Sequence, residues 1–192
     1  MATATHGSSI VFPSEAFNPK ATLQAIQEYS CTALYGVPTM FLAELEFLSE
    51  GSVGNSGFQH LRTGIASGTN VPKQLMHRLH DMLNLTELTI CYGMTETSPV
   101  SCMTTTDDPM QKRLETVGRL LPHVRAKIVG AEDRKKVLGI GEKGELAVAG
   151  YNVMKGYWGD QKRTDEALIK DEGGTIWMHV GPVHVYWERE KS

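Results

Sequence analysis

The sequence lacks the features that are typical of membrane proteins, secreted proteins and nucleic-acid-binding proteins. No apolar run reaches the roughly 20 residues that a membrane-spanning helix needs. The start, MATATHGSS, has neither the basic region nor the apolar stretch of a secretory signal. Basic residues are not in excess, because 19 Lys and Arg stand against 22 Asp and Glu, a net charge of −3. These absences predict no transmembrane segment and no nucleic-acid partner.

Cysteine is also scarce. Cys31, Cys91 and Cys102 are the three cysteines, and they form no CxxC pair. An odd number without metal-ligand spacing favours reduced thiols, packed as small apolar side chains, in an intracellular protein. We therefore expect the cytoplasm. The final residues, REKS, do not resemble a peroxisomal signal, but the sequence leaves peroxisome and mitochondrion open.

The first half of the 192 residues alternates strand and helix signals. A glycine- and serine-rich stretch at 51–57 predicts a mobile surface loop. Alternation at this spacing indicates a mostly parallel sheet covered by helices. The expected strands are 8–12, 31–36 and 61–68, and the expected helices are 18–30, a run opened by Pro38, and 71–83.

The pattern changes after residue 101. Short strand-like pieces at 124–130, 144–150 and 176–181 are separated by glycine turns, and no long helix is evident. The predicted fold class is α/β, with a partial parallel α/β sandwich subdomain followed by a β-rich subdomain. The predicted bounds are 1–108 for the α/β part, 109–182 for the β-rich part and 183–192 for a divergent tail.

The stretch TICYGMTETSPV, residues 89–100, ends a predicted strand with an unusual group of side chains. Ligands of parallel α/β sheets bind beyond the carboxyl ends of the strands. There Gly93 permits a tight turn, Thr95 offers a hydroxyl to a phosphate, and Glu96 suits a bridging Mg²⁺. An ordinary polar turn explains the same residues. A helix-capping box does not, because Ser98 stands three residues after Thr95.

Other stretches favour plain structural explanations. SGTNVPK (67–73) lacks the spacing of a phosphate-binding P-loop, and a turn before a helix explains it. The glycines of 141–160 predict a β meander, with Tyr151, Tyr157 and Trp158 packed beneath its turns. His77 and His80 share a helix face, for which solvent is a better partner than a metal.

Taken together, three motifs carry a specific resemblance. YGMTET (92–97), TVGRLLP (116–122) and GELAVAGYNVMKGYW (144–158) occur in this order and spacing in the adenylate-forming superfamily. The chain resembles acyl-CoA synthetases of the medium-chain type from about residue 8 to about residue 181. None of the motifs would suffice alone. The resemblance implies the fold of the large domain of these enzymes.

The resemblance also implies a reaction and its cofactors. Enzymes of this family form an acyl-adenylate from a carboxylic acid and Mg·ATP, and coenzyme A then displaces AMP to give a thioester. A fatty acid would be the substrate. By resemblance Tyr92 packs on adenine, Thr95 contacts phosphate, and Glu96 holds Mg²⁺, so that Thr95 and Glu96 are the catalytic candidates.

Further site residues follow from the same resemblance. Gly93 and Met94 belong to the nucleotide-binding turn, and Gly68 and Thr69 match a small-residue loop beside the adenine. The candidate acyl-pocket residues lie on two predicted strands and the helix after the first of them, namely Tyr35, Phe41, Gly64 and Ala66.

Parts of the family pattern do not match. The phosphate loop that ends in Pro-Lys-Gly is not in this sequence. The family's Thr-Gly-Asp, whose Asp binds the ribose, is Val180-Gly181-Pro182 here. Lys191 is the only lysine after Lys170, and nothing around it resembles the family's catalytic lysine motif. We therefore expect a truncated chain that is inactive alone and prone to self-association through exposed core faces.

Two other functions stay open. The chain is either a non-catalytic module that binds a nucleotide or a partner, or part of an enzyme that adenylates an aryl or amino acid. Nucleotide affinity without turnover would indicate the first. Activation of an aryl or amino acid by the enzyme would indicate the second. The sequence itself does not determine the acyl substrate.

Overall fold

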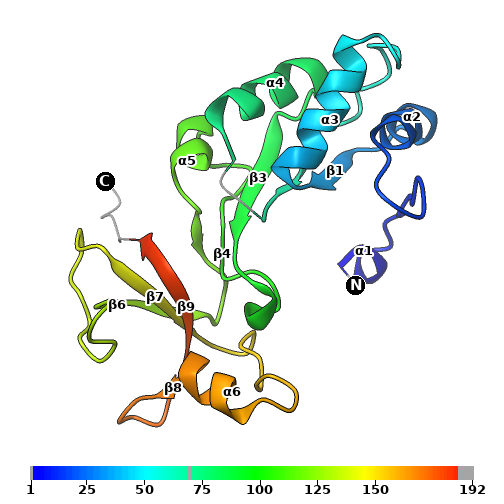
Figure 1. Cartoon of the computed structure of the whole chain (residues 1–192). Coiled ribbons are helices and arrows are strands. Elements are labelled where there is room, and N and C mark those ends of the chain that lie inside the picture. The colour runs from blue at the N-terminus through cyan, green and yellow to red at the C-terminus, as the bar shows by residue number, and fades with distance from the viewer. Residues whose placement is uncertain (1, 69–70, 186–192) are drawn as a thin grey trace. The chain divides into compact units, whose positions relative to one another are not determined.

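The computed structural model describes residues 2–68 and 71–185. They fall into two compact units, which are described separately (Figure 1). Unit 1 comprises residues up to Cys91 together with Thr104–Gly118, and unit 2 comprises Tyr92–Met103 and the residues from Arg119 onward. The chain thus passes between the units after residues 91, 103 and 118. The domain bounds expected from the sequence, 1–108 and 109–182, stay predictions.

Unit 1 is built on three parallel strands in the order β1-β2-β3. The pairing places Leu34 opposite Gly64 and Gly64 opposite Leu88. Only Tyr92, the last residue of β3, belongs to unit 2. The strands are β1 (Ala33–Gly36), β2 (Thr63–Ala66) and β3 (Glu87–Tyr92), and the helices are α1 (Ala2–Thr5), α2 (Pro19–Tyr29), α3 (Pro38–Ser49), α4 (Lys73–Leu83) and α5 (Met110–Glu115).

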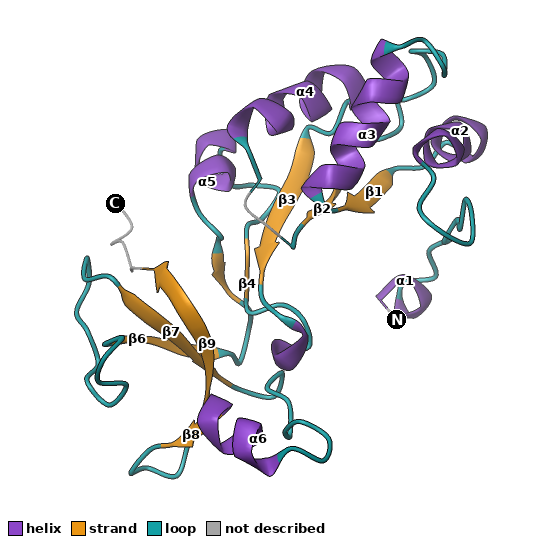
Figure 2. Ribbon diagram, in the orientation of Figure 1, coloured by secondary structure: helices purple, strands orange, loops and turns teal. Residues whose placement is uncertain are grey.

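The helices begin where the sequence predicts. Asn18 caps α2 by accepting a hydrogen bond from the Ala21 amide at 3.0 Å, and Pro19 occupies the first helical turn. Pro38 opens α3. Their apolar faces, with that of α4, bury a core against the strands (Figure 2). Its largest fully buried members are Leu23, Phe41, Leu45, Leu48, Leu61, Met76, Leu79, Leu83, Leu85 and Leu88.

One expectation for unit 1 needs correction. Residues 8–12 do not form a strand, because no described strand pairs with them, and the Ile10 and Phe12 side chains are 53% and 83% exposed. A strand is stable only beside a neighbour. Residues 51–57 form a loop, as predicted, and their mobility stays a prediction. Gln27 Nε2 on α2 donates to two carbonyls of this loop, those of Gly54 at 2.7 Å and Ser56 at 2.6 Å.

A buried arginine joins α5 to the start of β3 within unit 1. The Arg113 side chain is 7% exposed. Its Nη1 donates to the carbonyl of Leu88 at 2.9 Å, and Nη1 and Nη2 both donate to that of Thr86 at 3.1 Å. Nε donates to the Asp108 carbonyl at 3.1 Å. The planar guanidinium thereby satisfies several carbonyls at once, which an ammonium group would not reproduce.

Unit 2 contains an antiparallel sheet in the order β6-β7-β9-β8. The predicted strands are confirmed, but β9 lies between β7 and β8, so the sheet is not a simple meander. The elements are η1 (Thr95–Thr97), β4 (Cys102–Met103) paired with β5 (Arg119–Leu120), β6 (Arg125–Val129), β7 (Gly144–Ala149), α6 (Gln161–Ala167), β8 (Leu168–Lys170) and β9 (Ile176–Val185).

The two faces of β7 each bury a cluster in unit 2. Leu146 and Val148 pack with Val124 and Ile128 on one face, and Ala147 and Ala149 pack with Trp177 on the other. The aromatic expectation was wrong for Tyr151 and Trp158, which are 73% and 103% exposed. The fold class is confirmed as mixed α/β, with a parallel sheet followed by an antiparallel one.

In the described part of the chain, none of the helices has both the length and the apolar character needed to cross a bilayer.

Candidate functional site

The turn after β3 is closed so tightly that only glycine fits at its start. A Cβ atom placed on Gly93 would lie 1.9 Å from the Pro99 carbonyl oxygen. The Ser101 amide donates to the Tyr92 carbonyl at 2.8 Å, which brings the two ends of the turn together. Residues 93–100 therefore form a closed loop that carries Met94, Thr95 and Glu96.

The closed loop contains a capping interaction that the sequence reasoning dismissed. Thr97 Oγ1 accepts a hydrogen bond from the Met94 amide at 3.1 Å and donates to the Met94 carbonyl at 3.1 Å. The N-cap residue is Met94, one position before Thr95, which the sequence analysis considered. Thr97 stands three residues after it, where a capping box usually has Glu or Gln. The Thr97 side chain is fully buried, whereas that of Thr95 is exposed.

A second segment of unit 2, residues 150–157, holds this loop from outside. Asn152 is 4% exposed, and its Nδ2 donates to the carbonyls of Thr97 at 3.1 Å and Val100 at 3.2 Å. The Met154 amide donates to the Glu96 carbonyl at 2.8 Å. The family motif at 144–158 is therefore in direct contact with the YGMTET motif.

The same segment reaches the Glu96 carboxylate. The Tyr157 hydroxyl donates to Glu96 Oε1 at 2.9 Å, and this hydrogen bond is the main cause that raises the pKa of Tyr157. The Tyr157 amide donates to Thr164 Oγ1 at 2.9 Å, and the Arg163 guanidinium lies 4.7 Å from the centre of the tyrosine ring. The first turn of α6 thus fixes the backbone and the ring of Tyr157.

Tyr92 stands at the base of the loop. Its ring packs against the apolar cluster of Val124, Ile128, Leu146 and Val148. The hydroxyl is buried without a hydrogen bond to a described residue, and burial raises its pKa. The residue as a whole is half-buried.

The site residues expected on the first strands all lie in unit 1. Tyr35 on β1 is 59% exposed, whereas Phe41 on α3 and Ala66 on β2 are fully buried in the core. A Cβ on Gly64 would meet the Leu34 carbonyl oxygen at 1.7 Å, so glycine is required for the close approach of β1 and β2. Gly68 has a φ of +94°. Thr69 lies outside the described residues.

An ion pair between the exposed Arg134 and the buried Glu145 lies near α6 in unit 2. Glu145 is 4% exposed and accepts hydrogen bonds from Arg134 Nε at 2.8 Å and Nη2 at 3.2 Å. His179 Nδ1 lies 3.5 Å from Glu145 Oε2. Burial is the main cause that lowers the pKa of His179, which keeps the imidazole neutral near pH 7. Sequence reasoning assigned no function to these three residues.

Glu96 suits Mg²⁺ that arrives with a nucleotide better than a resident metal. Within the described residues no set of three or more His, Cys, Asp or Glu side chains is arranged to hold a metal. Glu96 is half-buried, Tyr157 occupies Oε1, and no hydrogen bond from a described residue reaches Oε2. Mg²⁺ is commonly bound by one or two carboxylates together with substrate phosphates and water, and a single free carboxylate oxygen fits that mode.

Pro182, the residue that the resemblance predicts at the position of a ribose-binding Asp, falls in β9. Val180 packs on the apolar cluster of unit 2. Glu145 on β7 pairs with His184 on β9, and Ala147 pairs with His179. The stretch of β9 between these two pairs is longer than the matching stretch of β7, so the pairing is irregular there. Pro182 lies in that interval and has no amide to donate, which is consistent with the irregular pairing. Lys191 lies outside the described residues.

Sequence reasoning did not identify Asn152 or the hydrogen bond of Tyr157. Both residues contact a loop more than 50 positions earlier in the chain, and no local pattern reports such a contact. The available signal was the proximity of both residues to the glycines of the 144–158 motif, since glycines often mark close backbone approach.

Comparison with known proteins places these motifs in a family. The chain is 49% identical to the acyl-CoA ligase SID4 of Ajellomyces capsulatus over 97% of its own length and 31% of that protein. It is 35% identical to the mitochondrial medium-chain acyl-CoA ligase ACSF2 of Bos taurus over 95% of its length and 28% of that protein. The chain thus spans about a third of the length of these relatives.

The fold agrees with this assignment. A crystal structure of the long-chain-fatty-acid-CoA ligase FadD1 from Archaeoglobus fulgidus matches 94% of this chain and 36% of that one, with a TM-score of 0.82 and 24% identity. The family model described as AMP-binding enzyme matches residues 1–158. The resemblance inferred from the motifs is confirmed, and the chain belongs to the AMP-binding enzyme family.

Proposed function

We propose that this chain carries the nucleotide- and Mg²⁺-binding corner of an acid–CoA ligase that acts on fatty acids. The observation that carries the proposal is the hydrogen bond between Tyr157 and Glu96, which joins two family motifs at one carboxylate. The names of the relatives support the reaction class, because they are acyl-CoA ligases, and one is a medium-chain enzyme.

In the proposed reaction the acid's carboxylate attacks the α-phosphorus of ATP. This forms the acyl–O–P bond of the acyl-adenylate and releases pyrophosphate. Coenzyme A then attacks the acyl carbon through its thiolate, forming the thioester and releasing AMP. Bound Mg²⁺ would neutralise charge on the polyphosphate. The chain's own residues bind and orient the nucleotide.

Each loop residue has a proposed part in this chemistry. The ring of the half-buried Tyr92 would pack on the adenine, with Gly93 and Met94 beside it. The exposed Thr95 hydroxyl is free to donate to a phosphate oxygen. Glu96 Oε2 is the metal ligand, while Oε1 stays bonded to Tyr157. Donors fixed before the reaction stabilise developing charge without reorganising.

The other site residues implied by the family resemblance lie in unit 1. Gly68 and Thr69 are the proposed neighbours of the adenine, and Tyr35, Phe41, Gly64 and Ala66 border the proposed acyl pocket. Phe41 and Ala66 would act through the packing of the core, because their side chains are fully buried. Tyr35 is exposed and would touch an acyl chain directly.

These 192 residues alone should not turn over substrate, because the family's phosphate loop and ribose-binding Asp have no counterpart in the sequence. Groups that act as a unit lose nearly all of their effect when part of the unit is absent. The test is a chimera in which this chain replaces the matched segment of the SID4 ligase. We expect ATP-dependent thioester formation by the chimera and none by the isolated chain.

The same assay separates the alternatives. A panel of medium-chain fatty acids, aryl acids and amino acids is offered to the chimera with ATP, Mg²⁺ and coenzyme A. Thioesters of the fatty acids support the proposal, and activation of only aryl or amino acids would replace its substrate. A folded chimera that binds ATP but activates no acid would instead favour a non-catalytic nucleotide-binding module.

A further inference from the structure

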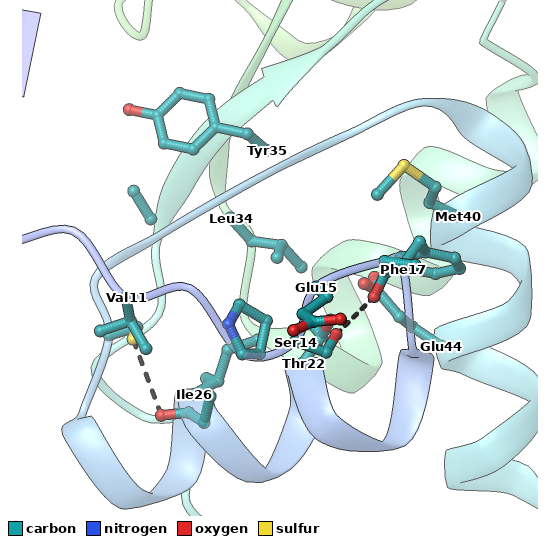
Figure 3. Close-up of a pocket in the computed structure, with 15 residues that line it drawn as sticks. Val11, Ser14, Glu15, Phe17, Thr22, Ile26, Leu34, Tyr35, Met40 and Glu44 are labelled. Carbon is teal, nitrogen blue, oxygen red and sulfur yellow. Dashed lines mark hydrogen bonds between the residues drawn. The ribbon is translucent and has the colours of Figure 1, made fainter. Parts of the chain in front are cut away.

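Unit 1 contains a cavity of about 360 Å³ whose lining shares only Tyr35 with the residues of the proposed acyl pocket. Its walls come from the segment 11–17, from α2, from β1 and the residues before it, and from the first half of α3 (Figure 3). Phe17 and Tyr35, which are 44% and 59% exposed, line it, so the cavity opens to solvent. Its size lies at the small end of the roughly 300–1,000 Å³ typical of ligand pockets.

One wall carries a carboxyl group that has lost its solvent without gaining a partner. Glu44 on α3 lines the cavity, and only 1% of its surface is exposed. Its Oε2 accepts no hydrogen bond from any described residue. Figure 3 shows the Glu44 side chain pointing from α3 toward the 11–17 segment. A buried polar atom without a partner is costly, and a donor placed in the cavity would remove that cost.

The other residues that line the cavity indicate which charge a bound hydrogen-bond donor would carry. The other polar groups include the Ser14 and Thr22 hydroxyls and a second carboxyl, that of Glu15. No Lys, Arg or His among the described residues lines the cavity, so an anionic ligand would meet two acidic groups without a counter-charge. The remaining wall is largely apolar and includes Val11, Pro13, Phe17, Ile26, Leu34 and Met40.

We propose that this cavity binds a small aliphatic primary ammonium compound, whose ammonium group donates to Glu44 and whose alkyl chain packs on the apolar wall. An ammonium group supplies three donors and a full positive charge, which matches the acidic groups. The cavity shares Tyr35 with the proposed acyl pocket, but its ligand differs from the acid substrate, because the ammonium compound and the acid have opposite charges.

Protonation of Glu44 is expected to change with binding. Burial raises the pKa of Glu44 to about 8, so the free carboxyl is mostly protonated at pH 7. A bound cation favours the carboxylate, and complex formation at pH 7 therefore releases a proton. The other titratable groups that face the cavity are Glu15, Cys31 and Tyr35. Affinity should rise from pH 6 to pH 8.5 as removal of the Glu44 proton becomes easier.

The experiment titrates the 192-residue chain with n-hexylammonium at pH 7.5, by calorimetry and by backbone amide NMR. We expect a dissociation constant of roughly 0.1–1 mM, as suits a seven-heavy-atom ligand. Glu44→Gln should weaken binding by about tenfold or more, because the neutral amide cannot pair with the cation. Glu46→Gln is the matched control, since Glu46 is exposed on the same helix, and it should leave the affinity unchanged.

A second variant tests the cavity without touching charge. Ala25→Leu on α2 places three more carbons in the lining and should abolish binding while Glu44 stays in place. Hexan-1-ol and hexanoate should bind about tenfold more weakly than hexylammonium or not at all. The proposal is overturned if the parent chain binds no hexylammonium at about 10 mM. It is also overturned if folded Ala25→Leu binds hexylammonium like the parent chain, or if hexan-1-ol or hexanoate binds the parent chain as tightly as hexylammonium does.

Discussion

The Tyr157 hydroxyl donates a hydrogen bond of 2.9 Å to Glu96 Oε1 across 61 positions of the sequence. This contact restricts the carboxylate of the candidate Mg²⁺ ligand to one orientation, with Oε2 available. Metal ligands are oriented by the groups that surround them, and loss of such a group commonly costs 10–100-fold in metal affinity or activity. We therefore predict that Tyr157 is a positioning residue.

Removing the Tyr157 hydroxyl should weaken the metal-dependent step. In the SID4 chimera we expect Tyr157→Phe to raise the Mg²⁺ concentration needed for half-maximal activity by about tenfold, since Glu96 is then free to rotate. A magnesium titration of the initial rate measures this. Tyr151→Phe is the control, because Tyr151 is 73% exposed. An unchanged magnesium requirement in Tyr157→Phe would remove the positioning role.

Asn152 should control the stability of the closed loop. Asn152→Ala leaves the Thr97 and Val100 carbonyls without their donor, at a cost of about 1–3 kcal/mol. Hydrogen exchange should show faster exchange of the Thr97 and Ser101 amides, both of which are bonded within the loop. Asn152→Asp should be no better, since a carboxylate cannot donate to a carbonyl. Equal loop exchange in Asn152→Ala and the parent chain would contradict the role.

Gly93 should tolerate no side chain. Gly93→Ala places a methyl group 1.9 Å from the Pro99 oxygen, so the loop must open to accept it. We expect loss of the slowly exchanging Ser101 amide and a fall in the free energy of unfolding of about 2 kcal/mol or more. Gly54→Ala is the control, because no atom lies within 4 Å of its Cβ position. An alanine variant with parental exchange would show that the loop adapts.

Local patterns predicted the elements of this fold more successfully than its long-range contacts. The Asn18-Pro19 pair marked the start of α2 correctly, because capping is decided within one turn of the chain. Residues 8–12 have strand-like composition, but strand formation needs a neighbouring strand, which composition does not report. In the same way, Asn152 and Glu44 gained their significance from tertiary burial.

The raised pKa of Glu44 should make the stability of unit 1 depend on pH. The folded-state pKa of about 8 exceeds the ordinary value of 4.5, so folding binds a proton between these values. The stability from this group is fully present below pH 4.5 and is lost as the pH rises through about 8. The full loss is on the order of 3–5 kcal/mol.

Glu44→Gln isolates this contribution. Urea unfolding of the parent chain and of the variant at pH 5, 7 and 8.5 gives two curves whose difference reports Glu44 alone. We expect the parent chain to lose stability relative to the variant as the pH rises. Parallel curves would mean that the Glu44 carboxyl is hydrated or paired in solution.

Glu96 is proposed to hold the Mg²⁺ of a nucleotide during acid activation. The most direct measurement is fatty-acid-dependent exchange of pyrophosphate into ATP by the SID4 chimera, with and without Glu96→Gln, across a Mg²⁺ titration. We predict exchange by the parent chimera and a loss of about 100-fold or more in the variant, which excess Mg²⁺ partly restores. A folded Glu96→Gln chimera with parental exchange at every Mg²⁺ concentration would show that Glu96 does not hold the metal.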